Sequence, residues 1–144
     1  MGKKRTVRKA GGGFDSALKA RSLSRAIKKK VSMGTLHIQS SYNNTQLVLT
    51  DKEGNTLCWA SSGSLGFKGT KKGTPFAAAK VGELIGEKAE AIGVKEVDVV
   101  IKGVGVGRES SLRAFASKGA QVRSIRDETP VPFNGPRPKK PRRV

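Results

Sequence analysis

The sequence of 144 residues is long enough for one modest domain, and it carries 29 Lys and Arg against 11 Asp and Glu, a formal net charge of +18. Its single cysteine excludes an intrachain disulfide and a cysteine-based zinc site, which fits a reducing compartment. The apolar runs fall short of the roughly 20 residues of a membrane span, and we expect no signal peptide and no membrane insertion.

The positive charge is concentrated at the two ends of the chain. Residues 1–30 hold eleven basic residues and one acid, and residues 129–144 hold five basic residues and no acid. The thirteen basic and ten acidic residues between them leave a net charge of only +3. A nearly neutral domain between two basic arms predicts a polyanionic partner. Charge alone leaves DNA, RNA and anionic lipid open, although the arms lack the large apolar groups that an interfacial helix buries.

The N-terminal arm, residues 1–31, is predicted to be extended. Three glycines at 11–13 interrupt it, and its few apolar residues are too sparse for a core. Leu23 and Ile27 are spaced i, i+4, so a short helix is compatible with RNA binding. The acid-poor composition also leaves an organellar transit peptide open, but three basic residues at 3–5 precede any amphipathic stretch and argue against it.

A globular domain is predicted over residues 32–128, beginning with three short strands. Alternating apolar and polar residues indicate strands at 35–41, 45–51 and 55–61, and the short turns between them force antiparallel hairpins. In the third strand, Leu57 and Trp59 are expected on one face. Cys58 and Trp59 are interpreted as packing residues, and His37, the only histidine, as a strand-face residue.

Helices and strands then alternate. A glycine- and lysine-rich loop at 63–73 precedes a helix that starts at Thr74-Pro75, because threonine caps and proline suits the first turn, and that stops at Gly93. The remaining elements are a strand at 97–101 expected to be covered on both faces, a helix at 109–118 and a weaker strand at 121–127. The order βββαβαβ predicts an α/β sheet carrying helices, followed by a proline-rich basic tail at 129–144.

The tail is the sharpest local feature for binding. Prolines hold it extended, so that its basic side chains spread along a line of phosphates at low ordering cost. The alternative is a solvated tail that aids solubility, which needs no proline spacing. The five cations are Arg137, Lys139, Lys140, Arg142 and Arg143.

Two glycine-rich segments precede the helices. In the first, at 66–73, glycines allow backbone N–H groups to approach phosphates beside a helix start; its spacing is not that of a Walker A loop, and the alternative is a flexible connection. The second, at 103–107, lacks the third glycine of a dinucleotide motif, so a structural anion nest with Arg108, Ser110 and Ser111 as donors fits better than a cofactor loop. No cofactor and no metal are expected.

The placement of acidic residues argues against RNA contact on one helix, and their absence from the first strand argues against catalysis. Glu83, Glu87 and Glu90 form a stripe on the long helix, interpreted as a solvated face turned away from RNA. A metal nuclease would need a carboxylate on the first strand, which has none, and three aspartates are scattered at strand ends. With one histidine and no catalytic set, we predict that the chain is not an enzyme.

Four ordered stretches resemble one known family. They are residues 41–45 (Ser-Tyr-Asn-Asn-Thr), 66–69 (Gly-Phe-Lys-Gly) with 74–78 (Thr-Pro-Phe-Ala-Ala), 102–110, and 127–135, which ends in Pro-Val-Pro-Phe-Asn-Gly. Over about residues 30–144 the chain resembles the bacterial-type small-subunit ribosomal protein S-eleven family. The resemblance implies a three-layer α/β/α, ribonuclease-H-like domain with a mixed five-stranded sheet and no catalysis. It departs from the family in two ways: Val104 and Val106 stand where prolines are usual, and the N-terminal arm is longer.

The resemblance also implies a function and partners. The protein would be a cytoplasmic structural constituent of the small ribosomal subunit, binding 16S-type rRNA on the platform and bridging several RNA helices near the mRNA exit and Shine–Dalgarno cleft. Implied neighbours are the S-seven and S-eighteen proteins, with initiation factor three nearby. The side chains expected to contact RNA are polar or basic: Lys28, Lys29, Lys30, Asn43, Asn44, Lys68, Lys71, Lys72, Arg108, Ser110, Arg113, Arg137, Lys139, Lys140, Arg142 and Arg143.

Two alternatives and one modification complete the sequence-based picture. Against a free regulatory module that binds nucleic acid, DNA included, the chain shows no helix-turn-helix or zinc pattern; against a metal nuclease, its first strand has no carboxylate. Asn134-Gly135 is a candidate for isoaspartate formation, because glycine lets its nitrogen approach the asparagine side chain; the alternative is an ordinary turn.

Overall fold

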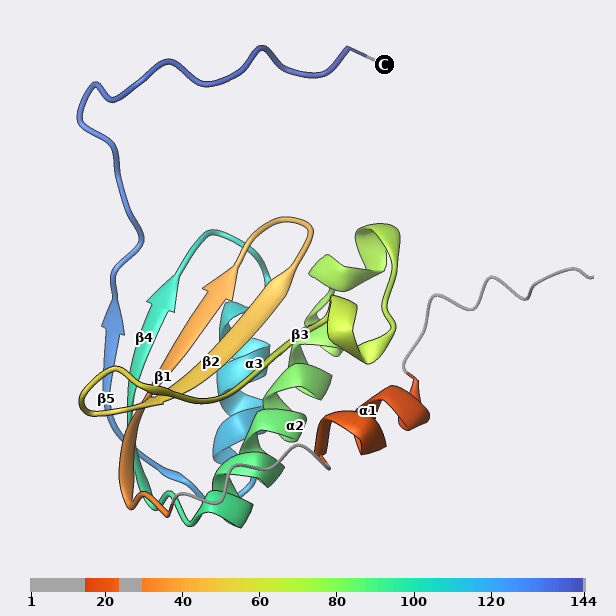
Figure 1. The fold of residues 1–144 in the computed structure, drawn as a ribbon. Helices are drawn as coiled ribbons and strands as arrows, with labels where there is room; N and C mark the ends of the chain where they lie inside the picture. Colours follow the sequence, from red (N-terminus) through yellow and green to blue (C-terminus); the bar gives the residue numbers. More distant parts are fainter. Residues whose placement is uncertain (1–14, 24–29, 144) are drawn as a thin grey trace, which may run out of the picture.

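The structure, a computed structural model, describes residues 15–23 and 30–143 and contains one mixed five-stranded sheet (Figure 1). The strand order is β3-β2-β1-β4-β5, in which β1 and β2, and β2 and β3, are antiparallel, whereas β4 is parallel to β1 and to β5. The elements are α1 (Ser16–Leu23), β1 (Met33–Ser40), β2 (Thr45–Asp51), β3 (Thr56–Ser61), the 3₁₀ turns η1 (Gly63–Leu65) and η2 (Gly69–Gly73), α2 (Pro75–Ile92), β4 (Glu96–Lys102), α3 (Gly107–Ala116) and β5 (Gln121–Asp127). The predicted order of the globular domain is confirmed.

The long helix α2 begins and ends where its sequence signals predict. The Thr74 hydroxyl accepts a hydrogen bond from the backbone N–H of Ala77 at 3.3 Å, and Pro75 occupies the first helical position. Gly93 ends the helix with a φ of 91°, a left-handed conformation that glycine adopts without steric cost. Its apolar stripe is fully buried against the sheet, with Val81, Leu84 and Ile85 at 0% exposure.

The described helices lie on one face of the sheet, so the described residues form two layers rather than the three that the family resemblance implies (Figure 1). Alternate residues of β1, including Leu36 and Ile38, are buried under α2 and α3, while the residues between them are half-buried or exposed. Helices α2 and α3 approach closely, because a Cβ atom on Gly82 would lie 2.4 Å from the backbone oxygen of Ser111. We call the opposite side, which no described helix covers, the open face.

The prediction of an entirely extended N-terminal arm is wrong at residues 16–23. Helix α1 begins after Asp15, whose carboxylate accepts hydrogen bonds from the backbone N–H groups of Ala17 and Leu18. The Asp15 N–H donates to the carbonyl of Leu65 at 2.9 Å, and Leu23 packs against the core. Because these contacts involve residues far along the chain, the few apolar residues of the arm gave no indication in the sequence that a helix docks there.

The strand β3 also differs from its predicted pattern, because it contains a bulge. The pairing of β2 with β3 shifts between Leu49 and Thr50, so that Leu57 is buried at 2% exposure while Trp59 is 56% exposed. The two residues therefore do not share a face, and Trp59 is not a core residue. At the centre of β4, Val99 and Val100 are both buried, as predicted, although no described helix lies over the side of Val100, and Asp98 on that side is half-buried.

Candidate nucleic-acid interface

Turns from three parts of the chain pack together at one end of the sheet, the upper end in Figure 1. A Cβ atom on Gly73 would lie 2.1 Å from the carbonyl oxygen of Tyr42, and one on Gly103 would lie 2.0 Å from that of Ser40. Only glycine permits such close backbone packing. We call this region the glycine edge, made of residues 41–44, 66–74 and 103–107.

The two asparagines of the β1–β2 turn have different environments. The side-chain oxygen of Asn44 accepts a hydrogen bond from the Ser62 hydroxyl at 2.7 Å, and the backbone of Asn44 is bonded to Ser41. Asn44 therefore holds the turn against the end of β3. Asn43 is exposed and presents its amide to solvent. Of the pair predicted to contact RNA, Asn43 is the accessible one.

The lysine-rich loop is more ordered than a flexible connection. Residues 69–73 form the turn η2, and the carbonyl of Lys71 accepts hydrogen bonds from both the N–H and the hydroxyl of Thr74. Lys68 and Lys71 are exposed, and Lys72 is half-buried. The start of α2 thus has two exposed ammonium groups beside it, an arrangement that attracts anions.

Arg108, which the sequence predicts to bind phosphate, is engaged by partners within the protein. Its guanidinium donates to the carbonyl of Gly103, to the Thr129 hydroxyl at 3.3 Å, and to the carboxylate of Asp127, with which it forms an ion pair. The Asp127 carboxylate in turn accepts hydrogen bonds from the Thr129 hydroxyl at 2.6 Å and from its N–H at 3.0 Å. We call Gly103, Arg108, Asp127 and Thr129 the tail clasp, because it fixes the point at which the tail leaves the sheet.

The charge of the tail clasp is set by these hydrogen bonds. The bond from the Thr129 hydroxyl, followed by that from Arg108, lowers the pKa of Asp127 from its ordinary value of 3.8 to about 2. Asp127 is therefore ionised at neutral pH and neutralises the Arg108 guanidinium. The side chain of Arg108 is 31% exposed, so it lies at the surface even while it is paired.

The other two predicted residues of α3 differ in what they offer a ligand. Ser110 is half-buried, and its hydroxyl donates weakly to the carbonyl of Gly107 at 3.5 Å. Ser111 is fully buried and donates to the same carbonyl at 2.7 Å, so it is structural. Arg113 is 79% exposed and pairs with Glu109 one turn earlier on the same helix, an exposed pair that competes little with a phosphate.

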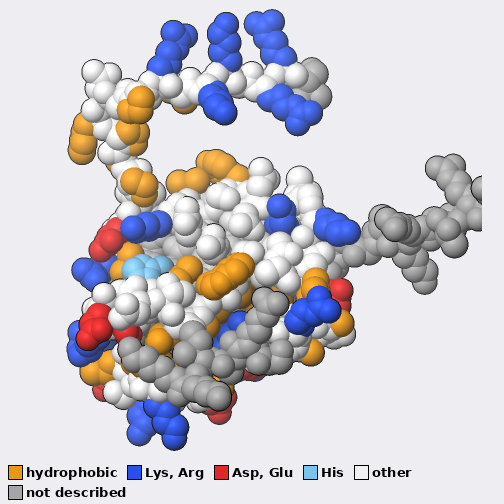
Figure 2. Space-filling view, in the orientation of Figure 1, with side chains coloured by type: hydrophobic (Ala, Val, Ile, Leu, Met, Phe, Trp, Pro, Cys, Tyr) orange, Lys and Arg blue, Asp and Glu red, His pale blue; other side chains and the backbone are white. Residues whose placement is uncertain are grey.

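All five tail cations are exposed and spread along an extended chain (Figure 2). Beyond the tail clasp the chain continues above the glycine edge, as Figure 1 shows. Lys30, at the other arm, is exposed just before β1, and Lys28 and Lys29 lie outside the described residues. The accessible basic groups at this end of the sheet thus include Lys68 and Lys71 of the lysine loop, Lys102 at the end of β4 and the cations of the tail.

The acidic stripe of α2 is not simply solvated. The carboxylate of Glu87 accepts hydrogen bonds from Lys19 of α1 at 2.8 Å and from Lys118 at 3.3 Å. Partial burial opposes ionisation of Glu87, but the two ammonium groups outweigh it, and the pKa of the carboxyl is lowered. Glu83 pairs with Lys80 within the helix. The stripe therefore serves in part to hold α1.

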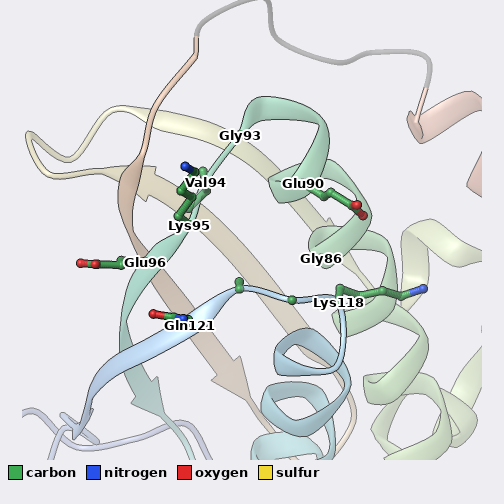
Figure 3. Close-up of a pocket in the computed structure, with 10 residues that line it drawn as sticks. Gly86, Glu90, Gly93, Val94, Lys95, Glu96, Lys118 and Gln121 are labelled. Carbon is green, nitrogen blue, oxygen red and sulfur yellow. The ribbon is translucent and has the colours of Figure 1, made fainter.

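A hollow of about 520 Å³ lies at the other end of the sheet, between the end of α2 and the loop before β5 (Figure 3). It is lined by charges of both signs, among them Glu90, Glu96 and Lys118. Figure 3 shows Glu96 pointing to one side and Glu90 and Lys118 to the other, so these charges do not converge on a ligand. Neither the charge nor the geometry suits a phosphate group.

The structure offers little for catalysis over residues 15–23 and 30–143. In these ranges no three His, Cys, Asp or Glu side chains lie close enough together to hold a metal ion. Asp98 is bonded to the Ser124 hydroxyl and to Arg123, which together lower its pKa, and Asp51 accepts hydrogen bonds from Asn55. Among the described helices, none is both long and apolar enough to cross a membrane.

Comparison with known proteins decides the family. The sequence model of the family described as Ribosomal protein S11 matches residues 34–143. This chain belongs to that family. It is 52% identical over 125 residues to the small ribosomal subunit protein uS11 of Leptothrix cholodnii, covering 87% of this chain and 93% of the relative. The protein of the same name from Thermotoga maritima is 52% identical over 118 residues (81% of this chain, 91% of the relative), and that of Treponema pallidum 54% over 117 residues (81% and 93%).

The S11 family consists of structural, non-enzymatic ribosome components, and this chain is not an enzyme. The prediction from the acid-free first strand and the single histidine is thereby confirmed. What the sequence reasoning missed is the tail clasp. The sequence did contain a signal for the turn, because an aspartate followed two residues later by a threonine is a common turn pattern. It contained none for Arg108, the partner 19 residues away.

Proposed function

We propose that this protein is a structural constituent of the small ribosomal subunit that binds small-subunit rRNA of the 16S type in translation. The single observation that carries the proposal is the distribution of charge. A nearly neutral domain presents five exposed tail cations and the exposed Lys68 and Lys71 of the lysine-rich loop at the same end of the sheet (Figure 2). Several separate cationic segments around one rigid domain suit an RNA that folds around the protein.

In this proposal the residues have distinct roles. The tail cations, Lys68 and Lys71 contact phosphates, and Asn43 contacts the RNA at the tip of its turn. Arg108 directs the tail and adds its exposed edge to the phosphate surface, while Asn44 and Ser110 support the turns that carry these groups. Lys72, Arg113 and the basic residues 28–30 contribute charge at the periphery.

The finer location also remains a proposal. The family resemblance supports a ribonuclease-H-like domain on the platform of a cytoplasmic ribosome, bridging several RNA helices near the mRNA exit and Shine–Dalgarno cleft. Its neighbours would be the S-seven and S-eighteen proteins, with initiation factor three nearby. The two-layer arrangement leaves the open face and the glycine edge free of described helices, which suits contact with more than one RNA helix.

Co-sedimentation and footprinting test the proposal. The full chain is expected to co-sediment with small subunits at moderate salt and to protect separate segments of isolated small-subunit rRNA from hydroxyl radicals. A matched control is the chain with Lys68, Lys71 and the five tail cations replaced by glutamine, which keeps the core residues and should lose most of the protection. Sedimentation with large subunits alone, or equal protection by the control, would contradict the proposal.

A further inference from the structure

The open face of the sheet carries the only tryptophan and the only histidine of the chain on one row across the strands. His37 of β1 lies opposite Val48 of β2, and Val48 lies opposite Trp59 of β3. In the other direction His37 lies opposite Val100 of β4, which in turn lies opposite Arg126 of β5. Two rings, two small apolar side chains and a guanidinium therefore form one line from edge to edge.

The indole of Trp59 is available to a partner. Its residue is 56% exposed, because the bulge in β3 buries Leu57 and leaves Trp59 on the open face. Bulges commonly redirect a side chain in this way beside functional surfaces. A large exposed ring at the edge of a sheet with no described helix over it offers a flat surface for stacking.

The imidazole of His37 is half-buried, and a contact with Thr50 fixes its orientation. The Thr50 hydroxyl lies 3.4 Å from its Nε2 atom, and the ring is visible on the surface as the pale blue group in Figure 2. Burial, followed by the positive charge of Lys102, lowers the pKa of His37. The ring is thus neutral at physiological pH and presents a second flat surface.

Polar side chains flank these rings in a pattern that suits nucleotides. On the next row toward the glycine edge, Gln39 lies opposite Gln46 on one side and opposite Lys102 on the other. Amide groups both donate to and accept from base edges, and an exposed ammonium binds phosphate. The nearby acids are engaged, Asp98 with Arg123 at 3.0 Å and Glu128 with Arg126 at 3.6 Å.

We propose that the open face binds a short single-stranded segment of RNA, with one base stacked on Trp59, another on His37, and the backbone running toward Lys102. The two rings are two strands apart, about 9–10 Å, a separation that neighbouring or next-neighbouring unstacked nucleotides span. A base-paired helix would hide its base faces, so the segment must be unpaired. The inference rests on the proposed function, since it names a further RNA-binding surface distant from the tail.

Chemistry favours RNA over a protein helix on this face. A helix that packs on a sheet needs a broad apolar surface, whereas only one row here is apolar. The flanking rows contain glutamine, threonine and serine, including Thr35, Thr50 and Ser61, together with Asp98 and Lys102. A narrow line of rings between hydrogen-bonding side chains matches a strand of nucleotides better.

The single tryptophan makes the test direct. Hexauridylate and hexaadenylate, titrated into the full chain, are expected to quench its tryptophan fluorescence, and a duplex of the same length should quench it much less. With affinity measured by the anisotropy of a labelled hexanucleotide, since both variants lack the only tryptophan, Trp59→Ala is expected to weaken binding roughly tenfold, as the loss of one stacked base does, while Trp59→Phe retains most of the affinity. Neither variant removes a charge, so the salt dependence of binding should stay the same.

A matched control is Ile125→Ala, which removes an apolar side chain of the same exposure, 57%, from β5. It should leave hexanucleotide affinity unchanged. Unaltered fluorescence of the parent at saturating oligonucleotide, or equal affinity of Trp59→Ala, would overturn the inference even if the tail still bound rRNA. Quenching only by an S11-neighbouring ribosomal protein would also overturn it. Failure of the parent to bind any rRNA would instead overturn the proposed function itself.

Discussion

At the scale of single residues, the tail clasp gives Arg108, a predicted RNA ligand, a second role in positioning the tail. Arg108→Ala removes three hydrogen bonds and leaves Asp127 with Thr129 alone. We expect the domain to remain folded and RNA affinity to fall by roughly 1–3 kcal/mol, the cost of losing a charge-assisted contact and a fixed tail direction. Filter binding at constant salt measures the affinity. Arg113→Ala, which removes an equally charged side chain from the same helix, is the control and should cost less.

The same clasp predicts a pH dependence. Because folding lowers the pKa of Asp127, its carboxylate contributes stability that is fully present above the ordinary value of 3.8. That contribution is lost as the pH falls through about 2. NMR titration of the Asp127 carboxyl should therefore give a midpoint near 2 in the parent and a higher one in Arg108→Ala. An unchanged midpoint would show that Arg108 does not hold the carboxylate.

Asn134 is the second residue with a chemical prediction. It is the one described non-glycine residue with a positive φ, 53°, and all neighbouring tail residues are exposed. We expect the Gly135 nitrogen to attack the Asn134 side chain, releasing ammonia, and the succinimide to reopen with water as isoaspartate. Peptide mapping of ribosome-bound protein should show a gain of about one dalton with an isoaspartate fragmentation pattern, since the φ range of glycine permits the approach. Asn134-Gly135 found unmodified in essentially all molecules would reject this.

At the scale of elements, periodicity and end signals predicted most of the fold. Strands β2 and β5 and the ends of α2 follow from alternation, from Thr74-Pro75 and from Gly93, because these signals are local. Local signals could not show that Asn44 and Arg108 are held by other parts of the chain. Nor could they show the bulge at Leu57. A bulge adds one residue to a strand without any sequence signal of its own, yet it places Leu57 and Trp59 on opposite faces of the sheet.

Helix α1 is the clearest case of an element set by distant contacts. Eight residues are too few for a stable isolated helix, so its order depends on docking to Glu87, which lies 68 positions from Lys19. Glu87→Gln should expose the α1 amides to faster hydrogen exchange while costing at most roughly 1 kcal/mol of global stability, as partly exposed ion pairs do. Glu83→Gln, which affects a pair within α2, is the control. Equal protection of α1 in both variants would assign its docking to Leu23 instead.

At the scale of the whole molecule, most of the net positive charge lies outside the folded domain, in the two terminal segments of the sequence. The folded domain is nearly neutral, so its core packs without concentrated repulsion, while the tail extends five cations beyond the tail clasp. This distribution of charge explains why a polyanionic partner was easier to predict from the sequence than the number of layers in the fold. Charge and proline spacing can be read directly along the chain, whereas the second layer and the open face depend on which side of the sheet the helices occupy.

The tail is therefore expected to contribute a measurable share of the salt dependence of RNA binding. Removing residues 137–144 deletes five positive charges and lowers the formal net charge from +18 to +13. If most of these cations contact phosphates, the slope of log K against log salt should flatten by roughly three to four, at ~0.7–0.9 per contact. Titration of small-subunit rRNA between low and moderate salt measures both slopes. A chain of full length with the five cations changed to glutamine is the matched control, because it keeps the prolines and should behave as the deletion does. A steep slope retained by both variants would place the phosphate contacts on the lysine loop and the N-terminal arm, because only charges that displace counterions from RNA can contribute to it.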